Sequence, residues 1–250
     1  MLVIRTTHEF QKFVGGTNFD GVEIQGFSAY NEDMGRRIRV VIPGVPHHVT
    51  QRGVRRMPIF FDDDDRVSYL RKMSGKCTEH GLEVLCWCLM QNHVHLVVRP
   101  QSEDSLSLAV GRAHWAYVRD LNERLGWKGH LFEASFFSTP MDDAHTRNAL
   151  RYVLQNPVRA GITPTPEDYR WSSARFHLGL RRTDPLVRTG GELGPGDWEA
   201  LLSDGPTDLE EIRACTREGR PYGSDEFLAW VGSRSGVDFS KRRRGRPRSR

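Results

Sequence analysis

The stretch Met90-Gln91-Asn92-His93-Val94-His95-Leu96-Val97-Val98-Arg99, MQNHVHLVVR, joins a polar turn to a β-type segment. Residues two apart along a strand point to the same side of the sheet. His93 and His95 therefore face one side, and Val94, Leu96 and Val98 face the other. The aliphatic side suits a face covered by helices, which leaves the imidazoles on an open face. Two imidazoles can bind one divalent cation but do not complete its coordination.

The segments around this stretch predict a β-α-β-β-α-β order. Strands are expected over residues 47–52, 82–90, 93–100 and 129–141, and helices over residues 60–81, 105–126 and from 142 to about 156. Only Gln91 and Asn92 separate the two middle strands, which predicts a tight antiparallel hairpin. The order matches the ferredoxin-like pattern. We therefore predict an α+β fold with helices on one face of a βαββαβ sheet, a tyrosine-bearing helix near the open face, and a C-terminal helical extension.

The last predicted helix of this order adds further chemistry. Its apolar stripe consists of Leu150, Val153 and Leu154, and Tyr152 lies off that stripe with Asn156 one turn later. If the helix crosses the open face, a phenol and an amide oxygen meet the two histidines. A phenol, a cation and a basic surface suggest phosphoryl transfer on nucleic acid, with Tyr152 as the nucleophile. The alternative is that the His-x-His spacing is coincidental and Tyr152 packs on the domain surface.

Positive charge is concentrated at the C-terminus. The net charge is +4, and the last ten residues, KRRRGRPRSR, contain seven Lys or Arg and no acid, so the other 240 residues carry −3 (4 minus 7). Arg244 and Arg246 lie in an Arg-Gly-Arg-Pro segment that resembles an AT-hook, which places arginines in the minor groove of DNA. A solvated tail is the alternative. Arg52, Arg55 and Arg56 form a basic loop that either contacts phosphate or is simply solvated.

Several segments resemble, in order, the single-tyrosine HUH transposases, and in particular their REP-associated and IS200-like branch. These segments are PHHVTQRGVRR, FFDDDDRVSYL, MQNHVHLVV, LRYVLQNPVRAGI and WSSARFHLG, and they span about residues 43–180. The resemblance implies that His93 and His95 bind Mg²⁺ or Mn²⁺, with Asn156 as the third ligand. It implies that Tyr152 attacks single-stranded, REP-like hairpin DNA and leaves a 5′-phosphotyrosine and a 3′-hydroxyl. Strand joining would reverse this reaction without ATP.

The sequence departs from the family's pattern at two positions. Phe132 stands where a Trp is expected, and Ser135 stands where an Arg is expected, which affects substrate contacts more than chemistry. His48 is expected to be a neighbour of the site, with plain packing as the alternative. Tyr117 is the rival nucleophile, although its surroundings predict helical core. Glu133 is a further candidate for assisting the metal.

The domain organisation follows from changes in composition along the chain. We predict a poorly defined or disordered segment over 1–38, a catalytic domain over 39–180, a linker over 181–207, a small helical module over 208–238 and the AT-hook-like basic tail over 239–250. No apolar run is long enough for a membrane helix, and no signal peptide is recognisable. The four cysteines include no CxxC pair, so no disulfide framework is expected. A cytoplasmic, nucleoid-associated protein is predicted.

Two other functions remain open alongside the strand transferase. A regulator that binds DNA hairpins would keep the fold and lose transposition, although both histidines and Tyr152 are present. A replication-initiator or relaxase-type nickase would use the same chemistry, but often carries a longer histidine motif or a helicase. The sequence leaves both a monomer and a homodimer possible.

Overall fold

The computed structural model describes residues 39–188, 193–204 and 209–239, and all of them belong to one compact unit that spans residues 33–250. The predicted N-terminal segment 1–38 lies outside the described residues. Arg244 and Arg246 of the basic tail also lie outside them. In the described part of the chain, none of the helices is both long enough and apolar enough to span a bilayer.

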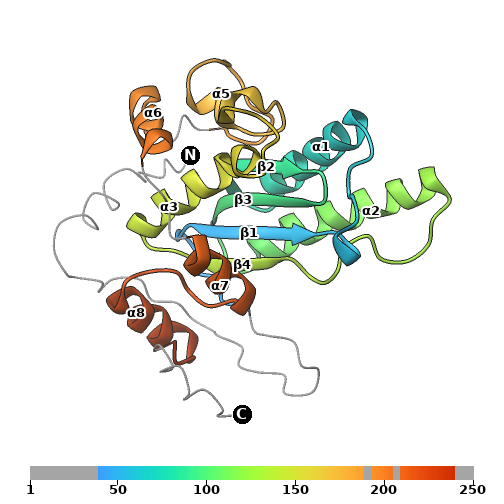
Figure 1. The fold of residues 1–250 in the computed structure, drawn as a ribbon. Coiled ribbons are helices and arrows are strands. Elements are labelled where there is room, and N and C mark those ends of the chain that lie inside the picture. Colours follow the sequence, from blue (N-terminus) through green and yellow to red (C-terminus); the bar gives the residue numbers. More distant parts are fainter. Residues whose placement is uncertain (1–38, 189–192, 205–208, 240–250) are drawn as a thin grey trace, which may run out of the picture. The chain divides into compact units, whose positions relative to one another are not determined.

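A four-stranded sheet forms the centre of the fold (Figure 1). Its strands are β1 (His47–Arg52), β2 (Leu82–Met90), β3 (His93–Pro100) and β4 (Phe137–Pro140). They lie in the order β2-β3-β1-β4, and every neighbouring pair is antiparallel. Together with the helices between the strands, this arrangement confirms the predicted α+β, ferredoxin-like fold.

The hairpin of β2 and β3 places the histidine segment at the middle of the sheet. Met90 pairs with His93, so Gln91 and Asn92 alone make the turn, as predicted. On its other side β3 pairs with β1, with Thr50 opposite His95 and Arg52 opposite His93. The register therefore brings the histidines beside the end of β1 that leads into the basic loop.

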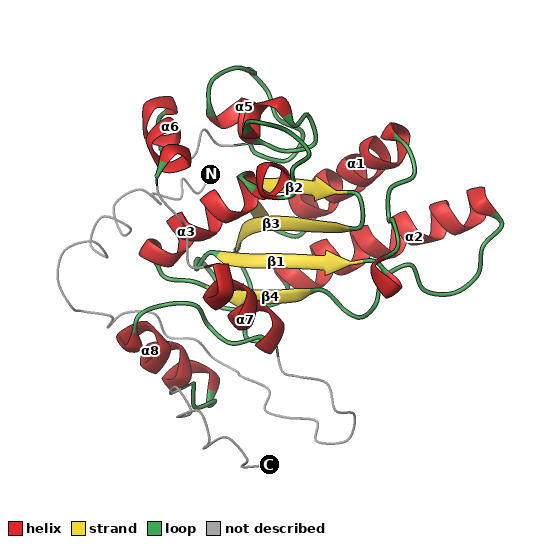
Figure 2. Ribbon diagram, viewed as in Figure 1, coloured by secondary structure: helices red, strands yellow, loops and turns green. Residues whose placement is uncertain are grey.

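Two helices cover one face of the sheet. In Figures 1 and 2, α1 (Asp63–Glu79) and α2 (Arg112–Leu125) lie behind the strands. Val49, Val94, Leu96 and Val98 are fully buried, as expected for strand residues that face the helices. The Asp62 side chain accepts a hydrogen bond from the backbone N–H of Asp65 and caps α1, whose first turn is acidic.

The tyrosine-bearing helix α3 (Asp143–Leu154) packs against β1, β2 and β3. The Asp142 side chain caps it by accepting from the backbone N–H of His145. The helix ends two residues before the predicted Asn156, and α4 (Asn156–Arg159) follows directly with Pro157 near its start. Proline tolerates the first turn of a helix because its missing N–H would have no intrahelical partner there.

The remaining elements are short or C-terminal. They are η2 (Val54–Arg56), the π-helical η3 (Ser107–Gly111), η4 (Pro166–Asp168), α5 (Ala174–His177), α6 (Pro195–Ser203), α7 (Leu209–Glu218) and α8 (Asp225–Ser235). Figure 1 shows α7 in front of β1 and β4, which it contacts. The predicted strand over 129–141 forms regular ladder only over Phe137–Pro140, preceded by an isolated bridge between Phe132 and Gly53. All four cysteines are free and buried.

Candidate active site

His93 and His95 point to the sheet face opposite Val94, Leu96 and Val98, as the alternation predicts. Their ring centroids lie 4.9 Å apart, and the rings are nearly perpendicular. His95 is 5% exposed, whereas His93 is half-buried at the strand end. Two imidazoles at this spacing form one side of a candidate cation site.

The hydrogen bonds of Asn92 fix the tautomer of His93. The Asn92 amide nitrogen donates to the carbonyl oxygen of Arg56 over 3.0 Å, which directs the amide oxygen toward the imidazole. That oxygen accepts from His93 Nδ1 at 2.7 Å. Nδ1 therefore carries the hydrogen, and Nε2 keeps its lone pair. The same asparagine ties the basic loop to the histidine strand.

A longer relay fixes the tautomer of His95. The Thr216 hydroxyl on α7 donates to the Ile212 carbonyl at 2.7 Å, so its oxygen accepts from His48 Nδ1 at 3.0 Å. His48 Nε2 is then unprotonated and accepts from His95 Nδ1 at 2.9 Å. The lone pair of His95 therefore lies on Nε2, as it does in His93. Such outer partners orient imidazoles that bind metals.

Burial keeps the imidazoles neutral. Desolvation, assisted by the charge of Arg52, lowers the pKa of His93 to about 4. The pKa of His95 lies well below its usual value, first because of burial and then because His93, His48 and two arginines are nearby. Burial alone lowers the pKa of His48 to about 3. Neutral rings are the form in which histidine binds a cation.

Tyr152 lies against this histidine cluster. Its ring meets His95 edge-on, with centroids 5.4 Å apart, and His48 in the same way at 5.7 Å. The side chain is buried, although the sequence pattern places it off the apolar stripe of α3. Its partners are polar rings, which is why a stripe defined by aliphatic residues misses it.

Two guanidinium groups accompany Tyr152. The Arg159 guanidinium lies 4.4 Å from the ring centroid and donates to the Tyr152 backbone carbonyl at 2.7 Å. A hydrogen bond with the Tyr152 side chain is the largest cause of the raised pKa of Arg213 on α7. Positive charge therefore lies where a phosphate approaching the phenol would need compensation.

Asn156 begins α4, one turn beyond Tyr152. Its amide nitrogen is buried and has no hydrogen-bond partner among the described residues. Rotating the amide would exchange its nitrogen and oxygen, so this unpaired position suits an oxygen ligand. Within residues 39–188, 193–204 and 209–239, no three His, Cys, Asp or Glu side chains could hold one metal ion. A site built on His93 and His95 therefore needs a ligand of another kind, and Asn156 remains the predicted one.

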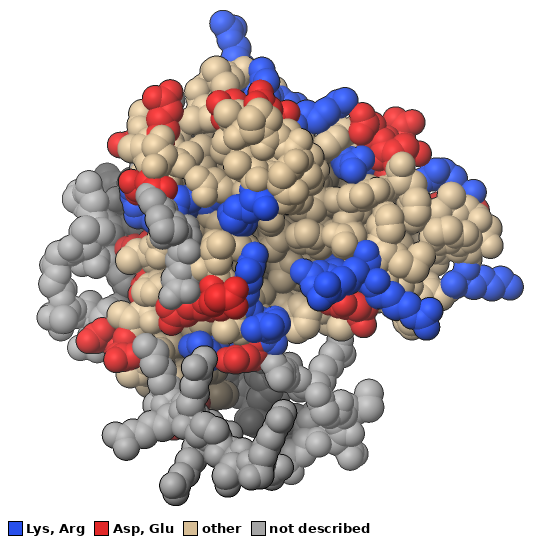
Figure 3. Space-filling model, viewed as in Figure 1, with Lys and Arg blue, Asp and Glu red and all other residues tan. Residues whose placement is uncertain are grey.

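The basic loop lies beside the histidine strand. Arg55 and Arg56 are exposed, and both have left-handed backbone conformations, with φ of 51° and 61°. Such angles are uncommon for residues other than glycine and are associated with functional sites. Figure 3 shows basic side chains gathered over η2 and the end of β1. Arg52 is half-buried at the end of β1, directly before this loop. The three arginines predicted to contact DNA therefore lie within residues 52–56.

The other candidates lie away from the cluster or support the fold. The Tyr117 hydroxyl donates to the Ile59 carbonyl at 2.5 Å, and burial raises its pKa, so this tyrosine belongs to the core. His47 faces away from His48, and its Nδ1 donates to the Val45 carbonyl at 2.7 Å. Glu133 is exposed, and its backbone N–H bonds to Arg52.

Sequence reasoning missed four residues of the site. They are Asn92, Arg159, Arg213 and Thr216. Asn92 has a local signal, because a polar residue directly before a strand histidine can bond its ring. Thr216 and Arg213 lie on a helix more than fifty residues beyond Tyr152 in the chain, and nothing in their local pattern indicates where α7 packs.

The family described as "Transposase IS200 like" matches residues 44–156, from the turn before β1 to Asn156. Residues 44–156 match the IS200-like transposases. The resemblance predicted from the sequence is thereby confirmed over this stretch, which we call the IS200-like domain. The IS200-like domain contains both histidines, the basic loop, Tyr152 and Asn156, whereas Arg159, Arg213 and Thr216 lie beyond it.

Individual proteins are also similar to this chain. It is 23% identical over 133 residues to a Haemophilus influenzae protein provisionally named a REP-associated tyrosine transposase, covering 49% of this chain and 69% of that protein. It is also similar to a solved structure described as a REP-associated tyrosine transposase bound to a REP hairpin. That similarity has a TM-score of 0.48 and 17% identity, and it covers 70% of this chain and 96% of the other.

Proposed function

We propose that this protein is a metal-dependent DNA strand transferase that cleaves and rejoins single-stranded hairpin DNA through Tyr152. The observation that carries the proposal is the contact of the Tyr152 ring with His95 and His48. A nucleophile held beside neutral imidazoles with directed lone pairs is suited to attack on a phosphodiester.

In the proposed reaction, the Tyr152 oxygen attacks the phosphorus of the scissile phosphodiester and its proton passes to solvent. The bond from phosphorus to the 3′-oxygen breaks, and that oxygen takes a proton and leaves as a 3′-hydroxyl. The product is a 5′-phosphotyrosine. Attack by a 3′-hydroxyl on the phosphotyrosine reverses the step, and no ATP is needed because one ester bond replaces another.

The residues of the site divide this work among them. His93 and His95 would hold Mg²⁺ or Mn²⁺ through their Nε2 atoms, with Asn156 as the third protein ligand. When bound, the cation polarises the phosphodiester and offsets its negative charge. Arg159 lies over the tyrosine ring, and Arg159 and Arg213 both add positive charge near the phenol. Arg52, Arg55 and Arg56 would contact the phosphates of the incoming strand, as would Arg244 and Arg246 of the tail.

The test is cleavage of end-labelled hairpin oligonucleotides taken from the DNA that flanks the gene. We expect cleavage with Mn²⁺, none with EDTA, and none by Tyr152→Phe, while the variant still binds the hairpin. Tight binding without cleavage by the unaltered protein would favour the regulator that binds hairpins. Full cleavage by Tyr152→Phe would place the nucleophile elsewhere.

A further inference from the structure

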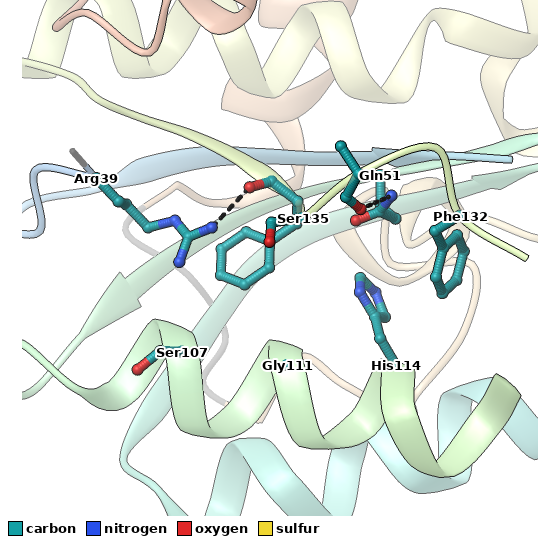
Figure 4. Close-up of a pocket in the computed structure, with 9 residues that line it drawn as sticks. Arg39, Gln51, Ser107, Gly111, His114, Phe132 and Ser135 are labelled. Atoms are coloured by element: carbon teal, nitrogen blue, oxygen red, sulfur yellow. Dashed lines mark hydrogen bonds between the residues drawn. The ribbon is translucent and has the colours of Figure 1, made fainter. Parts of the chain in front are cut away.

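A second candidate site lies on the opposite face of the sheet from the histidines. A partly open cavity of about 260 Å³ lies between η3 and α2 on one side and β1 and the segment that leads into β4 on the other (Figure 4). Its walls include Gln51, Gly111, His114 and Phe132, and exposed Ser135 lies at its edge. Phe132 and Ser135 are the two positions where the sequence has smaller residues than the family's pattern predicts.

Gln51 directs an unused acceptor into this region. The side chain is 2% exposed, and its amide nitrogen donates to the carbonyls of Arg52 at 3.2 Å and Ala134 at 3.1 Å. Two carbonyl partners fix the amide nitrogen, so the amide oxygen must point the other way. In the described part of the chain that oxygen accepts no hydrogen bond. The oxygen is accessible from the cavity, so a ligand or a water molecule can donate a hydrogen bond to it there.

His114 offers a donor beside it. The imidazole is 6% exposed and points from its helix toward the sheet, next to Phe132 and below Gln51 (Figure 4). Its Nε2 lies 2.9 Å from the Tyr69 hydroxyl. Tyr69 is fully buried, and its hydroxyl is paired with the His114 ring. The hydroxyl therefore donates its hydrogen to Nε2, which accepts it. Burial lowers the pKa of His114 to about 3, so the neutral ring carries its hydrogen on Nδ1, which has no acceptor among the described residues.

The remaining walls are aromatic and cationic. The Phe132 ring lies 4.8 Å from the His114 ring, and the Arg39 guanidinium lies 3.7 Å from the centroid of Phe136. The cavity thus combines flat apolar surfaces with one neutral donor, one neutral acceptor and a nearby positive charge. Its volume is slightly below the range of about 300–1,000 Å³ that holds drug-sized ligands, which suits a single planar heterocycle.

We propose that this cavity holds one unpaired nucleobase of the DNA strand, read by Gln51 and His114 and packed against Phe132. The proposal rests on the proposed function, because it takes the substrate to be single-stranded DNA. All four bases carry a donor or acceptor edge and a flat face, so the pocket suits a base turned out of the strand. Gln51 and Arg52 are consecutive on β1 and point to opposite faces of the sheet, so the cavity and the basic loop are reached from different sides.

Gly111 allows the cavity to be filled with little strain. A Cβ atom built on Gly111 has nothing within 4 Å, and its backbone is helical, with φ of −61°. Gly111→Leu should therefore occupy the free space, and Gly111→Ala is the matched control that adds only a methyl group. Both should raise the melting temperature slightly, because glycine in a helix costs about 1 kcal/mol relative to alanine. A loss of binding would then not reflect unfolding.

The experiment measures hairpin binding in EDTA with oligonucleotides that each lack one base in the single-stranded flanks. For the unaltered protein and Gly111→Ala, we expect one position where loss of the base weakens binding about tenfold. Gly111→Leu should bind the intact oligonucleotide about tenfold more weakly and be insensitive to the missing base. An unaltered affinity and position profile in Gly111→Leu, or no sensitive position in any protein, would overturn the base pocket.

The covalent reaction separates this outcome from a failure of the proposed function. If the same oligonucleotides form a Mn²⁺-dependent adduct with the unaltered protein, a flat base profile refutes the pocket and leaves the strand transferase intact. If the protein neither binds nor cleaves them, both proposals fail.

Discussion

The two faces of the central sheet are made by the same strands but differ in chemistry. On the face that carries α3 and α7, His95 hydrogen-bonds to His48 and its ring meets Tyr152 edge-on. On the face that carries α1 and α2, Leu96 and Val98 are fully buried in the apolar core. One step along β3 therefore separates a site residue from a core residue. Substitutions at adjacent β3 positions should then change either the cleavage rate or the free energy of unfolding.

The largest effect should come from replacing adjacent residues that face opposite ways. His95→Ala removes a predicted cation ligand, and we expect cleavage to fall at least about a hundredfold, the equivalent of about 3 kcal/mol. Leu96→Ala leaves a cavity in the core and should lower the free energy of unfolding by about 2–5 kcal/mol. Single-turnover cleavage with Mn²⁺ and denaturant unfolding measure the two quantities.

Each of these variants is the control for the other. Folded Leu96→Ala protein, assayed well below its melting temperature, should cleave within a few-fold of the unaltered rate. Near-normal cleavage by His95→Ala would remove the metal-site claim. A loss of cleavage in folded Leu96→Ala as large as in His95→Ala would show that the two faces do not separate in this way.

Acid should weaken the fold through buried histidines that lie away from the predicted ligands. Burial lowers the pKa of His114 to about 3, and those of His47 and His177 to about 4. In the unfolded chain they titrate near 6.5, so between these values the unfolded state binds more protons. The free energy of unfolding should therefore fall as the pH drops below about 6.5, by up to roughly 2 kcal/mol per histidine at about pH 5.

The measurement is denaturant unfolding at about pH 7.5 and pH 5. These groups contribute little slope above about pH 7.5, because they are then almost wholly neutral in both states. Equal stability at the two pH values would mean that the histidines are not held neutral by burial.

Thr216 tests whether α7 contributes to the site through the relay. Thr216→Val keeps the shape but removes the oxygen that accepts from His48, which should loosen the tautomer of His95. We expect the apparent Mn²⁺ affinity in the cleavage assay to fall about 10–100-fold. Thr216→Ser retains the hydroxyl and should restore most of it. An equal loss in both variants would point to packing of α7 rather than to the relay.

The smallest effect should come from the tail. Deleting residues 241–250 removes Arg244 and Arg246. We expect weaker hairpin binding and a shallower slope of log affinity against log salt concentration. The slope should change by about one unit for each phosphate that the tail neutralises in the full chain. Cleavage at saturating DNA should stay unchanged. A salt dependence identical to that of the full chain would show that the tail does not bind phosphate.

Much of the fold could be predicted from local patterns. The β-type composition of residues 82–90, the alternation of residues 93–98 and the two residues between them indicated both strands and the turn, because these are local properties. The strand before β4 was overestimated, since apolar residues such as Phe132 and Phe136 line a cavity rather than a ladder. Periodicity alone does not distinguish these two uses of an aromatic side chain.

The candidate site was predicted only where its residues are near one another in the chain or follow a recognisable pattern. His93, His95 and Tyr152 met these conditions, and the rings of His95 and Tyr152 are in contact. Thr216 and Arg213 did not, because their place depends on how α7 packs across β1 and β4. Likewise, the tautomers of the histidines follow from hydrogen bonds across the fold, which no local pattern encodes.

The most direct test of the central claim is to identify the residue that becomes attached to DNA. The protein is incubated with a hairpin oligonucleotide and Mn²⁺, digested with protease and nuclease, and analysed by mass spectrometry. We predict that the nucleotide is found on the peptide containing Tyr152 and is absent from reactions with EDTA. A nucleotide on a peptide containing another tyrosine, or cleavage of the DNA without any covalent adduct, would contradict the account.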